Sequence, residues 1–159
     1  MSKLRTPMSF YTRGVSCIKD ARFLFENRGA TSNFGILLIY GVELLLSSFL
    51  LIKDRTLTAH EIYDKYHHNY RDMLDACKEF DEEKRITSDE VCSYIGFLAE
   101  RFSPSTDDIR FPRYAVLREF PLDLFDILEV NFVDPMFFIT KEWLKNDDQT
   151  RIKSESSGR

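Results

Sequence analysis

The sequence predicts an all-α protein, an up-and-down bundle of four to six helices. Apolar residues recur at steps of three and four in several segments, and almost none of the chain shows the alternation typical of strands. Start and stop signals separate these segments, and 159 residues are enough for one domain with a real core. We therefore expect one helical domain over residues 1–146 and a polar, disordered tail over residues 147–159.

The first helix is predicted over residues 9–27. Its apolar residues form one stripe at helical spacing: Tyr11, Val15, Ile18, Ala21 and Phe25. Gly29 follows Arg28 and provides the left-handed stop that commonly ends a helix.

The second helix, residues 34–52, reads FGILLIYGVELLLSSFLLI and carries Glu43 in its middle. A membrane span usually needs about 20 apolar residues, and a carboxylate at its centre costs roughly 2.5 to 3.5 kcal/mol. No second span is present to shelter Glu43. We therefore expect a soluble protein in which this helix is buried on nearly all sides, at the centre of the bundle.

The later helices are marked by local signals. Residues 56–70 are looser and partly helical, and a third helix is predicted over residues 70–80. Thr87 and Glu90 have the spacing of a capping box at the start of the fourth helix. A fifth helix is expected to begin near Pro121. Asp134-Pro135 then indicates a stop followed by a sixth helix.

Composition and charge narrow the class of protein. The net charge of −4 argues against a general nucleic-acid binder, because such domains are usually basic. The first residues have no apolar core or small-residue cleavage site of a secretory signal, and the three cysteines have no zinc spacing. We therefore expect a cytoplasmic protein with reduced cysteines. The basic residues of segment 1–30 and the acidic ones of 72–90 are either solvated faces or complementary docking patches.

Short motifs, in a fixed order, resemble those of the HEPN domain family. Glu43 lies in an apolar second helix, His68-Asn69-Tyr70 stands where the family has His-Asp-Leu, and Arg110-Phe111-Pro112 stands where it has Arg-Tyr-Pro. The resemblance covers residues 8–145, and Ser47 replaces the Lys that follows the Glu in the family. It implies a small cytosolic helical bundle that often forms a homodimer. It also implies a nucleotidyltransferase partner, or a place in a toxin–antitoxin or defence system.

The same resemblance implies an alternative function, that of a metal-independent ribonuclease. Such proteins use an Arg and a His four to six residues later, and Arg55 and His60 have this spacing. Arg would stabilise charge on the phosphate of RNA while His moves a proton from the 2′-hydroxyl group. The family places this motif in a late helix, however, whereas Arg55 directly follows the second helix. We therefore favour a non-catalytic interaction or binding module.

A polar stripe on the second helix is the candidate binding site. Tyr40, Glu43 and Ser47 lie at steps of three and four on an otherwise apolar helix. A buried carboxylate needs a partner, because desolvation would otherwise raise its pKa until it takes up a proton. Arg110 or Arg113 is the predicted partner, since the segment that carries them can fold back over the second helix.

His68 completes the predicted binding residues, through its place in the family motif. A metal site of His60, Asp64 and His68 would require one continuous helix over residues 60–68. The resemblance instead starts a new helix near His68. We therefore predict neither a metal site nor a cofactor.

Overall fold

The computed structural model describes residues 6–28, 32–102 and 120–158, and every secondary-structure element in these ranges is a helix. The predicted all-α bundle is therefore confirmed. The elements are α1 (Pro7–Arg28), α2 (Ser32–Lys53), α3 (Ala59–Tyr66), α4 (Tyr70–Phe80), α5 (Asp89–Phe102), α7 (Leu124–Leu128), the π-helix η1 (Glu129–Val133) and α8 (Asp134–Ser157).

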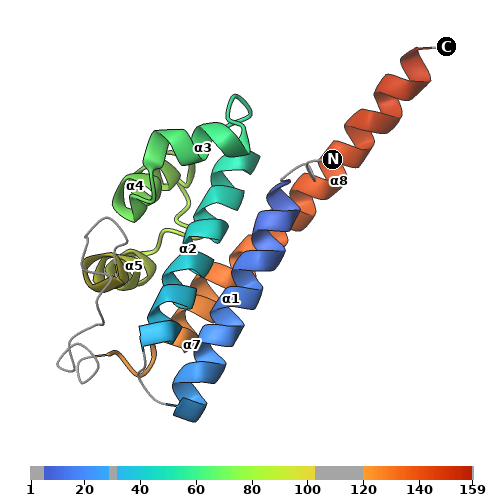
Figure 1. Cartoon of the computed structure of the whole chain (residues 1–159). Coiled ribbons are helices and arrows are strands. Elements are labelled where there is room, and N and C mark those ends of the chain that lie inside the picture. Colours follow the sequence, from blue (N-terminus) through green and yellow to red (C-terminus); the bar gives the residue numbers. More distant parts are fainter. Residues whose placement is uncertain (1–5, 29–31, 103–119, 159) are drawn as a thin grey trace.

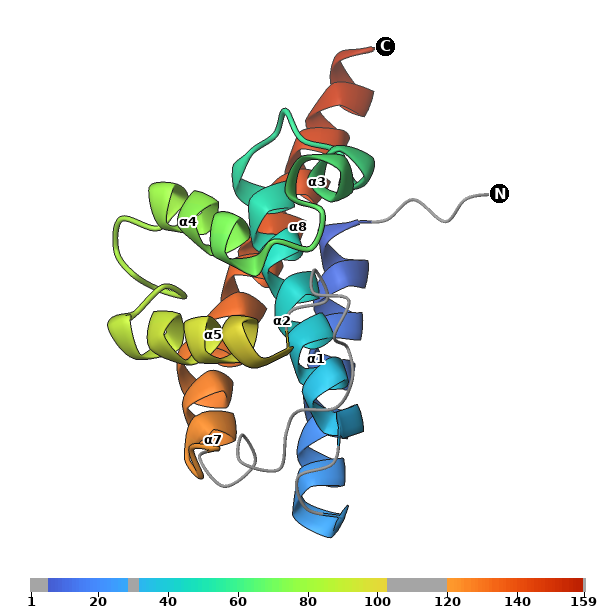
Figure 2. The same cartoon turned by 60° about the vertical axis from the view of Figure 1, so that its left-hand side comes forward.

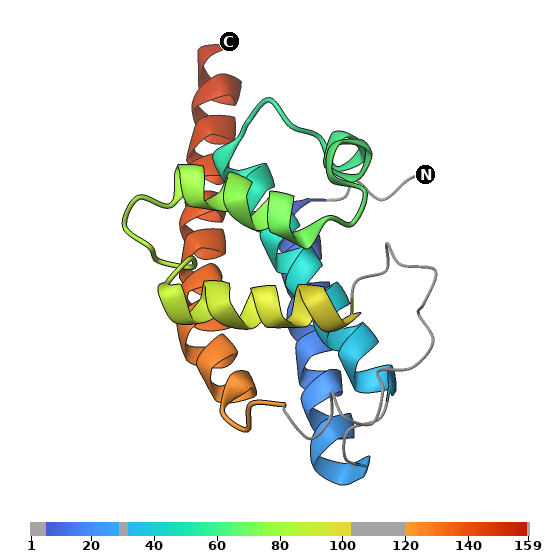
Figure 3. The same ribbon diagram turned by 90° about the vertical axis from the view of Figure 1, so that its left-hand side faces the viewer.

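Two groups of helices make up the bundle. The helices α1 and α2 run antiparallel, and α7, η1 and α8 run alongside them as one long helix (Figure 1). The helices α4 and α5 lie across this group, close to perpendicular to it (Figure 3). The helix α2 contacts α1, α3, α4, α5 and α8, so it is the element that joins both groups.

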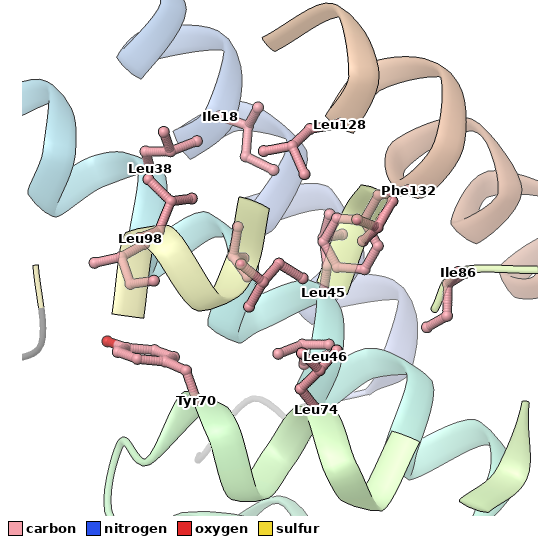
Figure 4. Packing of buried hydrophobic residues seen from close by; sticks show 14 of the residues in the cluster. Ile18, Leu38, Leu45, Leu46, Tyr70, Leu74, Ile86, Leu98, Leu128 and Phe132 are labelled. Atoms are coloured by element: carbon pink, nitrogen blue, oxygen red, sulfur yellow. The ribbon is translucent and has the colours of Figure 1, made fainter. Parts of the chain in front are cut away.

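The central helix α2 is buried along most of its length. Figure 4 shows Leu45 and Leu46 of α2 among side chains from α1, α4, α5, α7 and η1. The segment Phe34–Lys53 is long and apolar enough to cross a membrane, but 67% of its most apolar window is buried within the protein. Such burial fits the core helix of a soluble protein, as the central Glu43 predicted.

A pair of glycines lets α1 and α2 approach closely. A Cβ atom on Gly41 would lie 2.7 Å from Cγ1 of Ile18 and 2.8 Å from the carbonyl oxygen of Gly14. A Cβ atom on Gly14 would in turn lie 3.0 Å from the carbonyl oxygen of Gly41. The spacing of these two helices therefore depends on the absence of side chains at both positions.

The helix α4 has the predicted bounds, and side-chain caps define the starts of both α3 and α4. Thr58 and Glu61 form a reciprocal capping box at the start of α3, a signal that the sequence analysis missed. Asn69 caps α4, where its side-chain oxygen accepts a hydrogen bond from the Asp72 N–H group.

The predicted capping box of Thr87 and Glu90 is wrong. The Ser88 Oγ atom caps α5 instead, accepting a hydrogen bond from the Val91 N–H group at 3.3 Å. The Thr87 N–H and hydroxyl groups both donate to the buried carboxylate of Asp81, at 2.8 and 2.9 Å. Because Asp81 also accepts from the N–H groups of Arg85 and Ile86, its side chain holds the whole loop between α4 and α5.

The predicted start of a helix at Asp134, with Pro135 in its first turn, is confirmed, but the predicted stop before it does not interrupt the helix. The chain passes without a break from α7 through η1 into α8. Pro135 has no N–H group, and its ring conflicts with the carbonyl group four residues earlier. The π-helical turn Glu129–Val133 directly before α8 changes the hydrogen-bond register, so the chain remains helical through the proline.

The tail also differs from the sequence expectation, because α8 continues through residues 147–157. Its C-terminal part extends beyond the ends of α1 and α2 (Figures 1 and 2). Hydroxyl groups of Thr150 and Ser157 donate to carbonyl groups four residues earlier, as they do inside a helix. Helical hydrogen bonding therefore extends through a segment whose polar composition indicated disorder.

The close contact of α1 and α2 predicts opposite effects of alanine at two glycines. Gly41→Ala should destabilise the protein by about 1–3 kcal/mol, because its Cβ atom would push α1 away. Gly96→Ala is the control: no atom lies within 4 Å of a Cβ placed there, in the interior of α5. It should stabilise by up to about 1 kcal/mol. Urea unfolding measures both, and equal effects of the two changes would contradict the predicted contact.

Candidate functional site

The candidate site lies where α2 passes the junction of α3 and α4. The helix α3 ends at Tyr66, and the next two residues, His67 and His68, hold left-handed backbone conformations with φ of 43° and 63°. Such a conformation costs on the order of 1–3 kcal/mol for a residue with a side chain. Asn69 then starts α4, so the two histidines form the whole turn between the helices.

At this turn His68 binds the central carboxylate of α2. The His68 Nδ1 and Glu43 Oε1 atoms are 2.7 Å apart. The Glu43 side chain is 14% exposed and that of His68 is 39% exposed, so a buried carboxylate holds a half-exposed imidazole ring. With the carboxylate ionised, Nδ1 donates the hydrogen bond, and Nε2 is the nitrogen that remains for a ligand.

Burial and charge act against each other at Glu43. Desolvation raises the pKa of its carboxyl group, while the charge of His68 and the hydrogen bond to it lower the same pKa by less. The buried Tyr70 hydroxyl group also interacts with this carboxyl group, and its own pKa is raised, by burial first and by Glu43 second. The second carboxylate oxygen, Oε2, is buried and accepts no hydrogen bond of good geometry from the residues that the structure describes.

Aromatic and polar side chains surround the pair. The Tyr63 ring meets the His68 ring edge-on, with centroids 5.2 Å apart, and is itself 54% exposed. A cleft of about 560 Å³ opens beside the turn, lined by Lys65, Tyr66, His67, Asn69, Tyr70, Arg71, Asp72, Ala99 and Glu100. Arg71 in this cleft already binds Glu100 at 2.6 Å. The cleft therefore carries both signs of charge next to the Glu43–His68 pair.

The structure brings together two of the predicted binding residues, Glu43 and His68, but not the whole polar stripe. Tyr40 lies at the surface and lines a small separate cleft against α1, whereas Ser47 is buried. Arg110 and Arg113 lie outside the described residues, so their pairing with Glu43 stays a prediction.

Sequence reasoning did not anticipate that the partner of Glu43 would be His68. The useful signal was the resemblance itself, because Glu43 and His68 are both motif positions.

The residues of the ribonuclease alternative are exposed. Arg55 lies in the turn after α2, and the His60 side chain on α3 is 85% exposed. His60 makes an ion-pair contact of 3.3 Å with Asp64, which is itself exposed. Neither Arg55 nor His60 lines the clefts beside α1 or α4. Because α3 ends before His68, that residue does not continue the row of His60 and Asp64 either.

Comparison with known proteins adds no relative: no family model, curated protein or solved structure matches this chain. The site is therefore described by its own geometry alone.

The pKa of Glu43 predicts a specific pH dependence. Because the folded pKa lies above the unfolded one, the fold favours the protonated form. This contribution is present below the unfolded pKa and is lost as the pH rises through the folded pKa. Glutamine does not titrate, so Glu43→Gln should gain stability relative to the natural chain as the pH rises from about 4 through the folded pKa of Glu43.

Urea unfolding of both proteins across this pH range measures the difference. A relative gain by the natural chain as the pH rises would show that attraction to His68 outweighs burial at Glu43.

Proposed function

We propose that this protein is a non-catalytic, HEPN-like helical interaction module that acts as a cytoplasmic homodimer. In this proposal it belongs to a toxin–antitoxin or defence system, with a nucleotidyltransferase as its further partner. The order of the HEPN-like motifs supports the family, and so does the contact between two motif residues, Glu43 and His68.

The observation that carries the interaction role is an exposed apolar strip along α1 and the α7–η1–α8 helix, here called the α1–α8 face. Four of its large apolar side chains are 39–64% exposed: Phe23, Val130, Phe137 and Phe138. Apolar rings are contiguous where α1 meets α8: Tyr11 of α1 contacts Phe137, which in turn contacts Phe138, with ring centroids 6.3 and 5.5 Å apart. Contiguous exposed apolar surface of this kind marks protein interaction sites.

A groove runs through this face between the two helices. Its volume is about 430 Å³, and it is lined by Val15, Ile18, Lys19, Arg22, Phe23, Glu26, Phe125, Asp126, Glu129 and Val133. Arg22 spans the groove and binds Asp126 at 2.8 Å and Glu129 at 3.1 Å. These ion pairs hold α1 against α7 and η1, so the face is presented by a fixed pair of helices.

Charge complementarity favours a second copy of the chain as the occupant. On the α1 side of the groove Arg22 is already paired within the chain with Glu26, Asp126 and Glu129, so Lys19 is the basic residue offered to a partner. The opposite side also carries Asp134, at the start of α8. A two-fold axis across the face would place α1 of each copy against α7–η1–α8 of the other. Lys19 of each copy would then lie toward the acidic residues of the other, around a centre of aromatic side chains typical of interfaces.

The proposal predicts that one charge on this face breaks the dimer. Phe138→Glu should shift the protein from dimer to monomer, because it places a carboxylate among the aromatic side chains of the contact. Phe80→Glu is the matched control, since Phe80 is 41% exposed at the end of α4, away from the α1–α8 face. Sedimentation at micromolar concentration distinguishes the two species. A natural chain that sediments as a monomer, or equal effects of both substitutions, would contradict the proposal.

A further inference from the structure

The Glu43–His68 pair has the arrangement of a reactive histidine. The carboxylate of Glu43 binds Nδ1 at 2.7 Å, so the proton of a neutral His68 ring is held on Nδ1. The lone pair then lies on Nε2, which has no hydrogen-bond partner among the described residues. Because the Glu43 side chain is largely buried and that of His68 is 39% exposed, the carboxylate is sheltered while part of the imidazole side chain is accessible.

The backbone contributes to the same arrangement. Both His67 and His68 hold left-handed conformations, which fix the direction in which the His68 ring leaves the chain. The Tyr63 ring limits its movement on one side. Strained conformations of this kind persist where the surrounding structure determines them, and here α3, α4 and Glu43 do so.

The two other histidines lack a largely buried carboxylate partner among the described residues. His60 is 85% exposed and contacts the exposed carboxylate of Asp64, at 3.3 Å. His67 is exposed, and its ring meets the Tyr63 ring edge-on, with centroids 6.2 Å apart. His68 is therefore the histidine oriented by a carboxylate, and His60 and His67 can serve as controls for its reactivity in the same protein.

We propose that His68 is a nucleophilic site that accepts an electrophilic acyl or phosphoryl group at Nε2, with Glu43 as its positioning residue. In this step the Nε2 lone pair forms a bond to the carbonyl carbon or phosphorus atom. The bond from that atom to its leaving group breaks, and the leaving group departs with the bonding electrons. The proton on Nδ1 stays in the hydrogen bond to Glu43, which stabilises the positive charge that develops on the ring. This site is independent of the proposed dimer.

Diethyl pyrocarbonate is the acyl probe that tests the proposal, with the modified histidines identified by peptide mass spectrometry. In the natural chain His68 should react faster than His60, although it is less exposed. Glu43→Gln keeps an oxygen for Nδ1 but removes the charge. It should slow the reaction of His68 by about tenfold, the lower end of the loss measured at metal-binding histidines when the group hydrogen-bonded to the other ring nitrogen is removed.

The rates at His60 and His67 serve as controls and should not change in Glu43→Gln. A rate at His68 no higher than at His60, or one that Glu43→Gln leaves unchanged, would overturn the proposal.

Nitrogen NMR of the natural chain provides a second test that needs no variant. Neutral His68 should carry its proton on Nδ1, because that atom faces the Glu43 carboxylate. A proton found on Nε2 instead would leave no lone pair on that atom for the reaction and would overturn the proposal.

A parallel incubation with phosphoramidate distinguishes the two electrophile classes. Phosphorylation of His68, with release of ammonia, would support the phosphoryl class. Acylation without phosphorylation would support the acyl class alone.

Discussion

The burial of α2 is the constraint on which the rest of the structure depends. Its side chains from Leu38 to Leu50 are mostly inaccessible, so the helix must be covered on several sides. Burying one apolar side chain of this size contributes roughly 1.5–3 kcal/mol. No other helix among the described residues buries as many such side chains. The need to cover α2 accounts for the two groups of helices, because α1 and α8 cover one side of α2 while α4 and α5 cover another.

The same helix carries a carboxylate, and this conflict produces the candidate site. Glu43 cannot reach bulk water freely from its place in α2, and a buried charge needs a partner. His68 supplies one by leaving the helical path between α3 and α4 in a strained conformation. The core therefore determines the orientation of an accessible imidazole ring at the surface. A fold held by apolar burial thus positions the imidazole ring that we propose to react.

Local sequence patterns predicted the elements well, because helix periodicity and end signals act over a few residues. The bounds of α4 were predicted correctly, and α2 was recognised as central from its composition. Errors arose where the structure around a local sequence signal changed its effect. Thr87 has the spacing of a capping residue but binds Asp81 from the previous helix end. Pro135 indicated a break in the helix, yet the π-helical turn before α8 lets the chain remain helical there.

The candidate site was predicted in part. The sequence identified Glu43 as a buried carboxylate, and the family resemblance selected His68, but no local rule joins residues 25 positions apart. Their contact depends on how α4 packs against α2. The strained turn at His67 and His68 was not predictable either, because nothing in the two residue types favours a left-handed backbone as strongly as glycine would.

Amide hydrogen exchange in detergent-free buffer tests the central role of α2 most directly. If α2 is the buried core of a soluble bundle, the amides of residues 38–50 should exchange only by global unfolding. They should be the slowest in the chain, while amides of residues 147–157 exchange quickly. Exchange of the α2 amides as fast as those of α3, or a protein that stays in solution only with detergent, would contradict this account.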